Sequence, residues 1–159
     1  MRKLAFLFVC VAVLALLGAC GGEETATDKA VAPAVDNEFF SIKLAAGWQA
    51  GPLTSGMVNV LPKGKTSPGL YFKFEGHGNA VGTAEASIQS MIKGYNGSPM
   101  EDIEIAGTLF KATTYTYGGS TQTMYVAFRE GTKVTITIEG KDGKDNPDIQ
   151  AMIDSLVLK

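Results

Sequence analysis

Apolar and polar residues alternate strictly in three segments of the chain, and this pattern limits the folds that are open to it. The segments are FSIKL at residues 40–44, LYFKFE at 70–75 and KVTITIE at 133–139. Successive side chains of a β-strand point to opposite faces of the sheet, so the apolar residues of each segment share one face. Such strands are typical of antiparallel sheets, and their apolar face must pack against a second layer.

Four further apolar-rich segments favour strands, at residues 57–61, 103–105, 109–117 and 121–128. Two short glycine-containing sequences separate the later strands, GGS at residues 118–120 and EGT at residues 130–132. Both predict tight hairpin turns, which join strands that are antiparallel neighbours in the sheet.

Two segments change to a helical period. The first follows the candidate N-cap Thr83, and one helical face carries Ala84, Ile88, Met91, Ile92 and Tyr95. The second follows Asn146 and Pro147, which suit a cap and a first turn, and its apolar face carries Ile149, Met152, Ile153 and Leu156. Two helices that share one core with about six to seven antiparallel strands predict an α+β fold.

The N-terminus has the features of an export signal. Arg2 and Lys3 precede an uninterrupted apolar run at residues 4–17, which spans about 21 Å as a helix and is too short for the roughly 30 Å core of a bilayer. The sequence LGAC at 17–20 resembles the lipobox of bacterial lipoproteins, although Gly18 stands where Ala or Ser is more usual. The resemblance implies a signal peptide at residues 1–19 and lipidation of Cys20, whereas an ordinary cleaved signal is the alternative.

Three segments are therefore expected: a lipoprotein signal peptide at 1–19, a flexible tether at 20–38 and one domain at 39–159. The tether contains small, polar and proline residues without an apolar period. Because the cysteine of a lipobox carries lipid, we expect neither a disulfide nor a thiol-based site. Without Arg2 and Lys3, 12 of the 14 basic residues remain against 16 acidic ones, a net charge of about −4 that argues against nucleic acid as a partner.

The residue types that build catalytic and metal sites are scarce. His77 is the single histidine and lies between two glycines, and a lone histidine cannot build a typical zinc site. Asp142, Asp145 and Asp148 are spaced by three, but they do not match the ligand spacing of a calcium loop and suit a turn before a helix. We therefore expect no enzyme activity, no cofactor and no bound metal.

Aromatic residues are the candidates for a binding surface. Tyr115 and Tyr117 lie two apart on one expected strand, and Tyr125 lies on the next strand, out of phase with its apolar neighbours. These three tyrosines and Trp48 form a possible binding surface, because tyrosine and tryptophan are enriched at interfaces. Cross-strand aromatic pairs also stabilise sheets by themselves, and Trp48 equally suits a core position, so both alternatives remain open.

Residues 40–48 (FSIKLAAGW) are similar to the first strand of PsbP-like and DcrB-like domains, which commonly follow F-[ST]-[IV]-x-[LV]-P-x-G-W. Ala45 stands where that pattern usually has proline. The order of elements also fits: a hairpin, a helix, long antiparallel strands and a C-terminal helix. The resemblance implies a PsbP-like αβ sandwich and a non-catalytic domain that contacts partners, and it supplies no catalytic residues.

The expected function is that of a non-catalytic lipoprotein, anchored in the cell envelope by lipid, which binds another envelope component, protein or glycan, through its sheet. The alternative is a small-molecule or lipid carrier with an apolar pocket lined by Phe72, Phe74, Met91 and Trp48. Gly21 rather than aspartate follows Cys20. This favours the outer membrane in a cell that has one, with the domain facing the periplasm or the cell surface.

Overall fold

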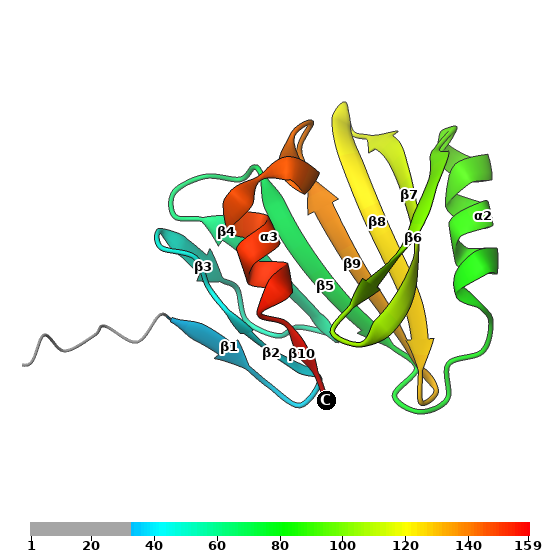
Figure 1. Cartoon of the computed structure of the whole chain (residues 1–159), viewed down its shortest axis with the longest axis horizontal. Helices are drawn as coiled ribbons and strands as arrows, with labels where there is room; N and C mark the ends of the chain where they lie inside the picture. Colours follow the sequence, from blue (N-terminus) through cyan, green and yellow to red (C-terminus); the bar gives the residue numbers. More distant parts are fainter. Residues whose placement is uncertain (1–32) are drawn as a thin grey trace, which may run out of the picture. The chain divides into compact units, whose positions relative to one another are not determined.

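Ten strands and two α-helices make up residues 33–159, the part of the chain that this computed structural model describes (Figure 1). The strands are β1 (Ala34–Asp36), β2 (Phe40–Lys43), β3 (Trp48–Ala50), β4 (Met57–Pro62), β5 (Gly69–Glu75), β6 (Ser98–Ile105), β7 (Thr108–Tyr117), β8 (Ser120–Arg129), β9 (Thr132–Glu139) and β10 (Val157–Leu158). The helices are α2 (Ala84–Tyr95) and α3 (Pro147–Asp154), and a 3-10 turn, η1 (Gly143–Asp145), precedes α3. This arrangement confirms the expected α+β class.

The strands form two antiparallel sheets. The large sheet has seven strands in the order β3-β4-β5-β9-β8-β7-β6, and the small sheet has three in the order β1-β2-β10. The pairing of β5 with β9 places Leu70 opposite Ile138 and Phe72 opposite Ile136. The apolar residues of both strands therefore lie on one face of the large sheet, called here the inner face, and their polar residues lie on the outer face.

The inner face carries the main core. Helix α3 and the small sheet pack on it, and the buried cluster includes Ile149 and Met152 from α3. Phe40 of β2 stacks on two residues of β5, with ring centroids 4.7 Å from Phe72 and 5.3 Å from Phe74. The first alternating segment thus belongs to the small sheet and covers the large one, as the apolar face of a half-buried strand requires.

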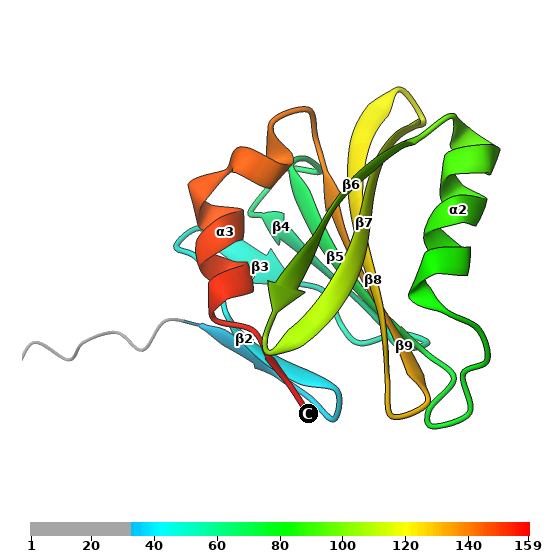
Figure 2. The same ribbon diagram turned by 45° about the vertical axis from the view of Figure 1, so that its right-hand side comes forward.

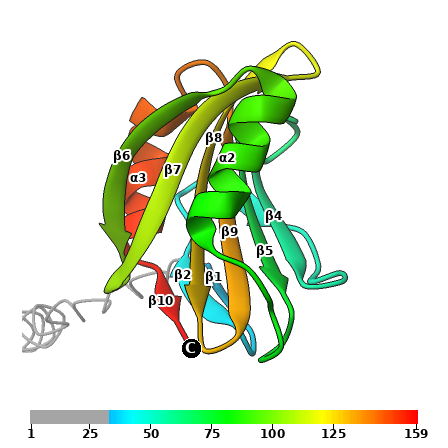
Figure 3. The same ribbon diagram turned by 90° about the vertical axis from the view of Figure 1, so that its right-hand side faces the viewer.

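Helix α2 covers the outer face mainly over β7 and β8 and also contacts β6 (Figures 2 and 3). Its N-cap is Thr83, whose hydroxyl accepts from the Ala86 amide at 3.1 Å, and its C-cap Asn96 has the left-handed backbone that ends many helices. Ile88 packs against Met124 and Val126 in a second, smaller apolar cluster. The N-cap of α2 and its apolar face agree with the sequence prediction, and so does α3 with its cap Asn146, whereas α2 ends at Asn96 and not at Gly94 or Gly97, the glycines expected to stop it.

Three hairpin turns have two residues each. In the β8–β9 turn, Glu130 and Gly131 have φ angles of 49° and 73°, and the GGS turn has positive φ at both Gly118 and Gly119. Two positive φ angles match the right-handed twist of the flanking strands. The two predicted hairpins are therefore present and join β7 to β8 and β8 to β9, while a third turn at Ala106 and Gly107 joins β6 to β7.

The boundary of the folded domain differs from the sequence prediction. Ala34–Asp36 of the expected tether form β1, which pairs with Ser41–Lys43 of β2, and Val35 packs against the main core. A strand of three residues with one inward side chain has too short an apolar pattern to be recognised in sequence. The signal peptide at 1–19 and Cys20 lie outside the described residues. Within residues 33–159, no helix has the length and apolar character that a membrane span needs.

The half-buried nature of β9 can be tested by one pair of neighbouring substitutions. Ile136 has 0 % of its surface exposed on the inner face, so Ile136→Ala should lower the free energy of unfolding by about 2–5 kcal/mol. Thr135→Ala, on the outer face, should cost less than about 1 kcal/mol. Urea denaturation of both variants measures the difference, and equal losses would contradict the assignment of the two faces.

Candidate functional site

The large sheet separates the three tyrosines of the predicted binding surface. Tyr115 and Tyr117 lie on the outer face beside α2, where both contact Tyr95 with ring centroids 5.5 and 5.7 Å apart. Tyr125 lies on the inner face, 6 % exposed and packed in the main core. The prediction for Tyr125 is wrong because β8 is buried on both faces, with Met124 and Val126 under α2, so its alternation does not distinguish inside from outside.

Trp48 belongs to the core and not to a binding surface. It is 4 % exposed, and its indole Nε1 donates a hydrogen bond to Asp148 Oδ2 at 3.0 Å. Buried tryptophans usually find a partner for this donor, and here the partner lies in the first turn of α3. Trp48 therefore ties β3 to α3. Of the four predicted residues, only Tyr117, with 61 % of its surface exposed, is widely accessible.

The residues suggested for a carrier pocket do not meet. Phe72, Phe74 and Trp48 are buried in the main core on the inner face, whereas Met91 belongs to the cluster beneath α2 on the outer face. The backbone of the large sheet lies between the two groups. The structure therefore gives no common cavity to these four residues.

The candidate metal and catalytic residues are scattered as well. His77 lies in an exposed loop, where its ring packs 5.2 Å from the ring of Phe39. Asp148 accepts from Trp48, and Asp145 forms an exposed ion pair with Lys144 at 2.8 Å. Among residues 33–159, no group of three or more histidine, cysteine or carboxylate side chains is placed to hold a metal ion.

A different surface stands out once the fold is known. We call it the open face: the outer-face residues of β5 and β9, which α2 does not cover. They are Tyr71, Lys73, Glu75, Lys133, Thr135, Thr137 and Glu139. All are polar or amphipathic and lie partly or fully exposed, in contrast to the apolar residues that β8 places under the helix. Helix α2 lies to one side of these strands (Figure 3).

A groove of about 560 Å³ runs between the open face and α2. Its floor is formed by Lys73, Lys133, Thr135 and Thr137. Its wall comes from one side of α2 and the loop before it, with Val81, Gly82, Thr83, Ala86, Ser87, Ser90 and Met91. The groove exists because α2 packs on β7 and β8 through one apolar face. The side of the helix that is turned toward β9 does not pack against the sheet.

Two ammonium groups share one carboxylate on the floor of this groove. Lys73 Nζ lies 2.8 Å from Glu75 Oε1, and Lys133 Nζ lies 3.4 Å from Glu75 Oε2. The hydrogen bond from Lys73, helped by the charge of Lys133, holds the pKa of the Glu75 carboxyl below its ordinary value. Glu75 therefore stays ionised, and the three side chains together carry one excess positive charge.

Tyr71 continues the open face beyond the groove. Its hydroxyl donates to Glu139 Oε2 at 2.8 Å, and its ring lies so close over Gly69 that a Cβ there would sit 2.6 Å from a ring carbon. Tyr71 also lines a hollow of about 310 Å³ with Pro52, Thr54, Met57 and Asn59. Glycine at position 69 thus lets the tyrosine ring lie along the sheet instead of projecting into solvent.

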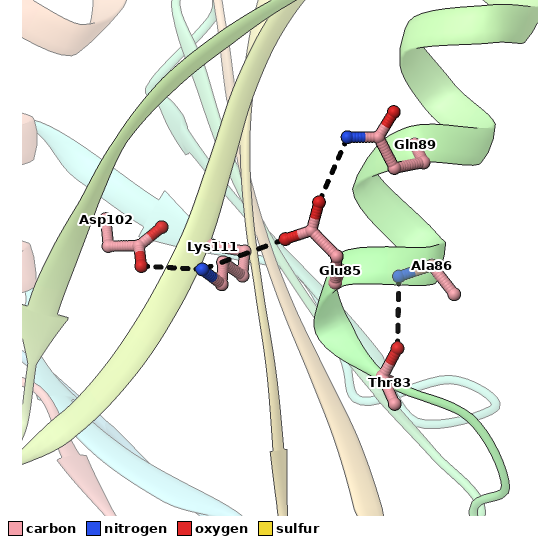
Figure 4. A network of polar contacts seen from close by, with 6 residues as sticks. All are labelled: Thr83, Glu85, Ala86, Gln89, Asp102 and Lys111. Carbon is pink, nitrogen blue, oxygen red and sulfur yellow. Dashed lines mark hydrogen bonds and ion pairs between the residues drawn. The ribbon is translucent and has the colours of Figure 1, made fainter.

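Lys111 links the helix to the edge strand on the far side of the groove (Figure 4). Its Nζ lies 2.8 Å from Asp102 Oδ2 of β6 and 3.7 Å from Glu85 Oε2 of α2. Gln89 donates to the other oxygen of Glu85 at 3.0 Å. The hydrogen bond to Asp102 raises the pKa of Lys111, but these groups are solvent-exposed, so their main effect is to orient α2 and not to stabilise it.

The polar alternation of β5 and β9 is visible in the sequence, but it does not mark these residues as a site. Lysine, threonine and glutamate on an outer strand face are ordinary for a solvated sheet, and no motif marks them. The signal that could have found them is the pairing of β5 with β9, which places Lys73 opposite Thr135 and Tyr71 opposite Thr137. That pairing joins strands that are not neighbours in the sequence.

The fold resembles known structures, although the sequence does not. No protein-family model matches the chain, and no curated protein is similar to it in sequence. The solution structure of cyanobacterial PsbP (CyanoP) from Synechocystis sp. PCC 6803 is 13% identical, with a TM-score of 0.54 over 91% of this chain and 99% of that chain. A crystal structure from Bacteroides thetaiotaomicron VPI-5482 is 14% identical, with a TM-score of 0.53 over 76% of this chain and 45% of that chain.

At these identities the likeness concerns the fold alone. The domain has a PsbP-like fold, as the resemblance of residues 40–48 implied. The match spans less than half of the Bacteroides chain. The DcrB-like lipoprotein part of the resemblance stays a prediction.

The ionisation of the Tyr71 hydroxyl on the open face can be measured. Burial, and secondly the hydrogen bond to Glu139, raises the pKa of Tyr71 to about 12. Because the pKa of Tyr71 is higher in the folded than in the unfolded protein, protonated Tyr71 contributes to the free energy of unfolding. This contribution is complete below the ordinary tyrosine pKa of about 10 and is lost as the pH rises toward 12. Absorbance titration at tyrosinate wavelengths should show one group near 12 that disappears in Tyr71→Phe and titrates lower in Glu139→Gln. An unchanged titration in both variants would contradict this geometry.

Proposed function

We propose that the domain is a non-catalytic binding module of the cell envelope, which contacts another envelope component through the open face and the groove beside α2. The observation that carries this proposal is the uneven covering of the large sheet. Its inner face packs against α3 and the small sheet, while the outer face of β5 and β9 is covered by no element of residues 33–159. A concave groove on such a face is the usual form of a ligand site.

The chemistry of the groove supports binding over catalysis. Its charged side chains Lys73, Lys133 and Glu75 already pair with one another, so the carboxylate is ionised and held as a counter-ion. A general base needs a free carboxylate or imidazole with a pKa near the working pH, and a nucleophile needs such a base beside it. The groove lining contains hydroxyls without a histidine or cysteine beside them.

The envelope location rests on the N-terminal sequence. The lipobox-like LGAC at 17–20 follows a positively charged, apolar segment of signal-peptide length. A lipidated Cys20 would hold the chain at a membrane surface and leave the domain in solution beside it, facing the periplasm or the cell surface. A module anchored in this way needs only moderate affinity, because its partner is confined to the same compartment.

The anchor is tested by removing the acceptor of the lipid. Cys20→Ala should abolish partition into the membrane fraction and leave an unprocessed or soluble chain, because the lipobox thiol that would carry the diacylglycerol is removed. Ser41→Ala, a substitution in the folded domain, serves as the control and should fractionate like the wild type. If Cys20→Ala still sediments with membranes after a high-salt wash, the lipoprotein assignment is wrong.

The binding surface is tested by crosslinking in intact cells. A photoreactive benzoyl-phenylalanine at Thr135, on the floor of the groove, should capture a second molecule and shift the mass of the chain. The same residue at Lys43, which is exposed on the small sheet, should give no specific adduct. Equal capture at both positions, or none at Thr135, would contradict a binding role for the open face.

A further inference from the structure

We infer that the ligand of the open face is an acidic glycan, a short carbohydrate chain bearing carboxylates, bound along the groove with a sugar ring on Tyr71. This inference rests on the proposed function and names the class of its ligand. It is carried by three properties of the surface that lie side by side: an excess positive charge, a row of hydroxyls and a flat tyrosine.

The positive charge selects an anion. Lys73 and Lys133 come from adjacent strands and point toward the same carboxylate, Glu75, at 2.8 and 3.4 Å. One carboxylate neutralises one ammonium, so the floor of the groove holds one unit of positive charge within an otherwise acidic protein. Glu139 does not cancel this charge in the groove, because it lies outside the lining and accepts from Tyr71. A ligand carboxylate here would form charge-assisted hydrogen bonds.

Hydroxyls lie beside the lysines on the floor of the groove and on the facing wall. Thr135 and Thr137 project from β9, and Ser90 faces them from α2. Within residues 33–159, none of these three hydroxyls forms a hydrogen bond to another side chain or to the backbone. Each can donate one bond and accept others, which matches the alternating donors and acceptors of sugar hydroxyls.

Tyr71 supplies an apolar platform at the end of this row. It lies opposite Thr137 in the β5–β9 register, and directly opposed residues on one face have Cβ atoms roughly 5 Å apart. Its ring is held along the sheet over Gly69 and borders the hollow near Asn59. The apolar C–H face of a sugar can pack on such a ring while its hydroxyls reach the neighbouring threonines.

The dimensions fit a chain and not a single sugar. The surface runs from Met124 of β8 across β9 and β5 to Asn59 of β4. Three steps between strands at about 4.8 Å give a length of roughly 14 Å. A ligand of two or three sugar units spans that distance.

The composition of the open face disfavours a protein partner. Protein interfaces are enriched in aromatic residues, methionine and arginine at their centre, and depleted in lysine and glutamate. The centre of the open face is the reverse, with Lys73, Lys133 and Glu75 beside threonines. The apolar residues of the groove lining lie on α2, beneath it or in the loop before it, and are Val81, Ala86, Met91 and Met124. A polar, hydroxylated ligand matches this centre better than an apolar protein patch.

The test uses the full chain in detergent and a hexamer of galacturonic acid as the probe, with binding measured by calorimetry. The fully methyl-esterified hexamer keeps the sugars and removes the charge, and hexaglutamate keeps the charge and removes the sugars. We expect saturable binding of the acidic hexamer and at least about tenfold weaker binding of both controls.

Matched variants locate the site. Lys73→Gln with Lys133→Gln should weaken binding of the acidic hexamer about tenfold, whereas Lys63→Gln, at an exposed turn, should not change it. Tyr71→Ala should weaken binding severalfold, and Tyr71→Phe, which keeps the ring, should bind nearly as well as the wild type. All substituted side chains lie on the outer face or in a turn, and far-ultraviolet circular dichroism checks that each variant is folded.

Three results would overturn the glycan inference. They are no binding of the acidic hexamer, equal binding of its methyl ester, or stronger binding of hexaglutamate, which would point to an acidic peptide. The crosslink from Thr135 then decides the proposed function separately. Capture of a polypeptide would leave the binding role of the open face intact, whereas absence of capture would remove both.

Discussion

The pleat of strands β5 and β9 is the constraint on which the rest of the domain depends. Because the two strands pair in register, six apolar side chains meet on the inner face and the polar residues between them meet on the outer face. The inner set binds α3 and the small sheet through the core, and the outer set forms the floor of the groove. A shift of one residue between these strands would exchange the two faces, so core packing and site geometry are fixed by the same register.

Helix α2 determines how much of the outer face remains available. It packs on β8, whose residues Met124 and Val126 are apolar on the outer face while Tyr125 is buried on the inner one. From β9 onward the outer face turns polar, and the covering helix stops there. The change from apolar to polar residues on the outer face, between β8 and β9, therefore determines where the sheet is covered by α2. The groove follows this line.

Local patterns predicted the helices, their N-caps and two of the hairpins, since each depends on residues close together in the chain. Thr83 and Asn146 cap the expected helices, and the turns at residues 118–119 and 130–131 close the expected hairpins. The pairing of strands that are far apart in the chain could not be predicted from local patterns. Tyr71 and Glu139, for example, form a hydrogen bond although they are 68 residues apart in the sequence. Tyr125 was misplaced because a strand buried on both faces has no distinguishing alternation, and β1 is too short to show one.

Strand β1 has a mechanical consequence. It joins β2 in a hairpin of three residue pairs, with the outermost pair Ala34–Lys43 nearest the chain leading in at Pro33. Beyond that pair the Leu44 amide donates to the Pro33 carbonyl at 2.7 Å, and Val35 packs against the main core. Because β1 pairs with β2 of the small sheet and with no strand of the large one, separating β1 from β2 would leave every hydrogen-bonded strand pair of the seven-stranded sheet, and with it the floor of the groove, in place.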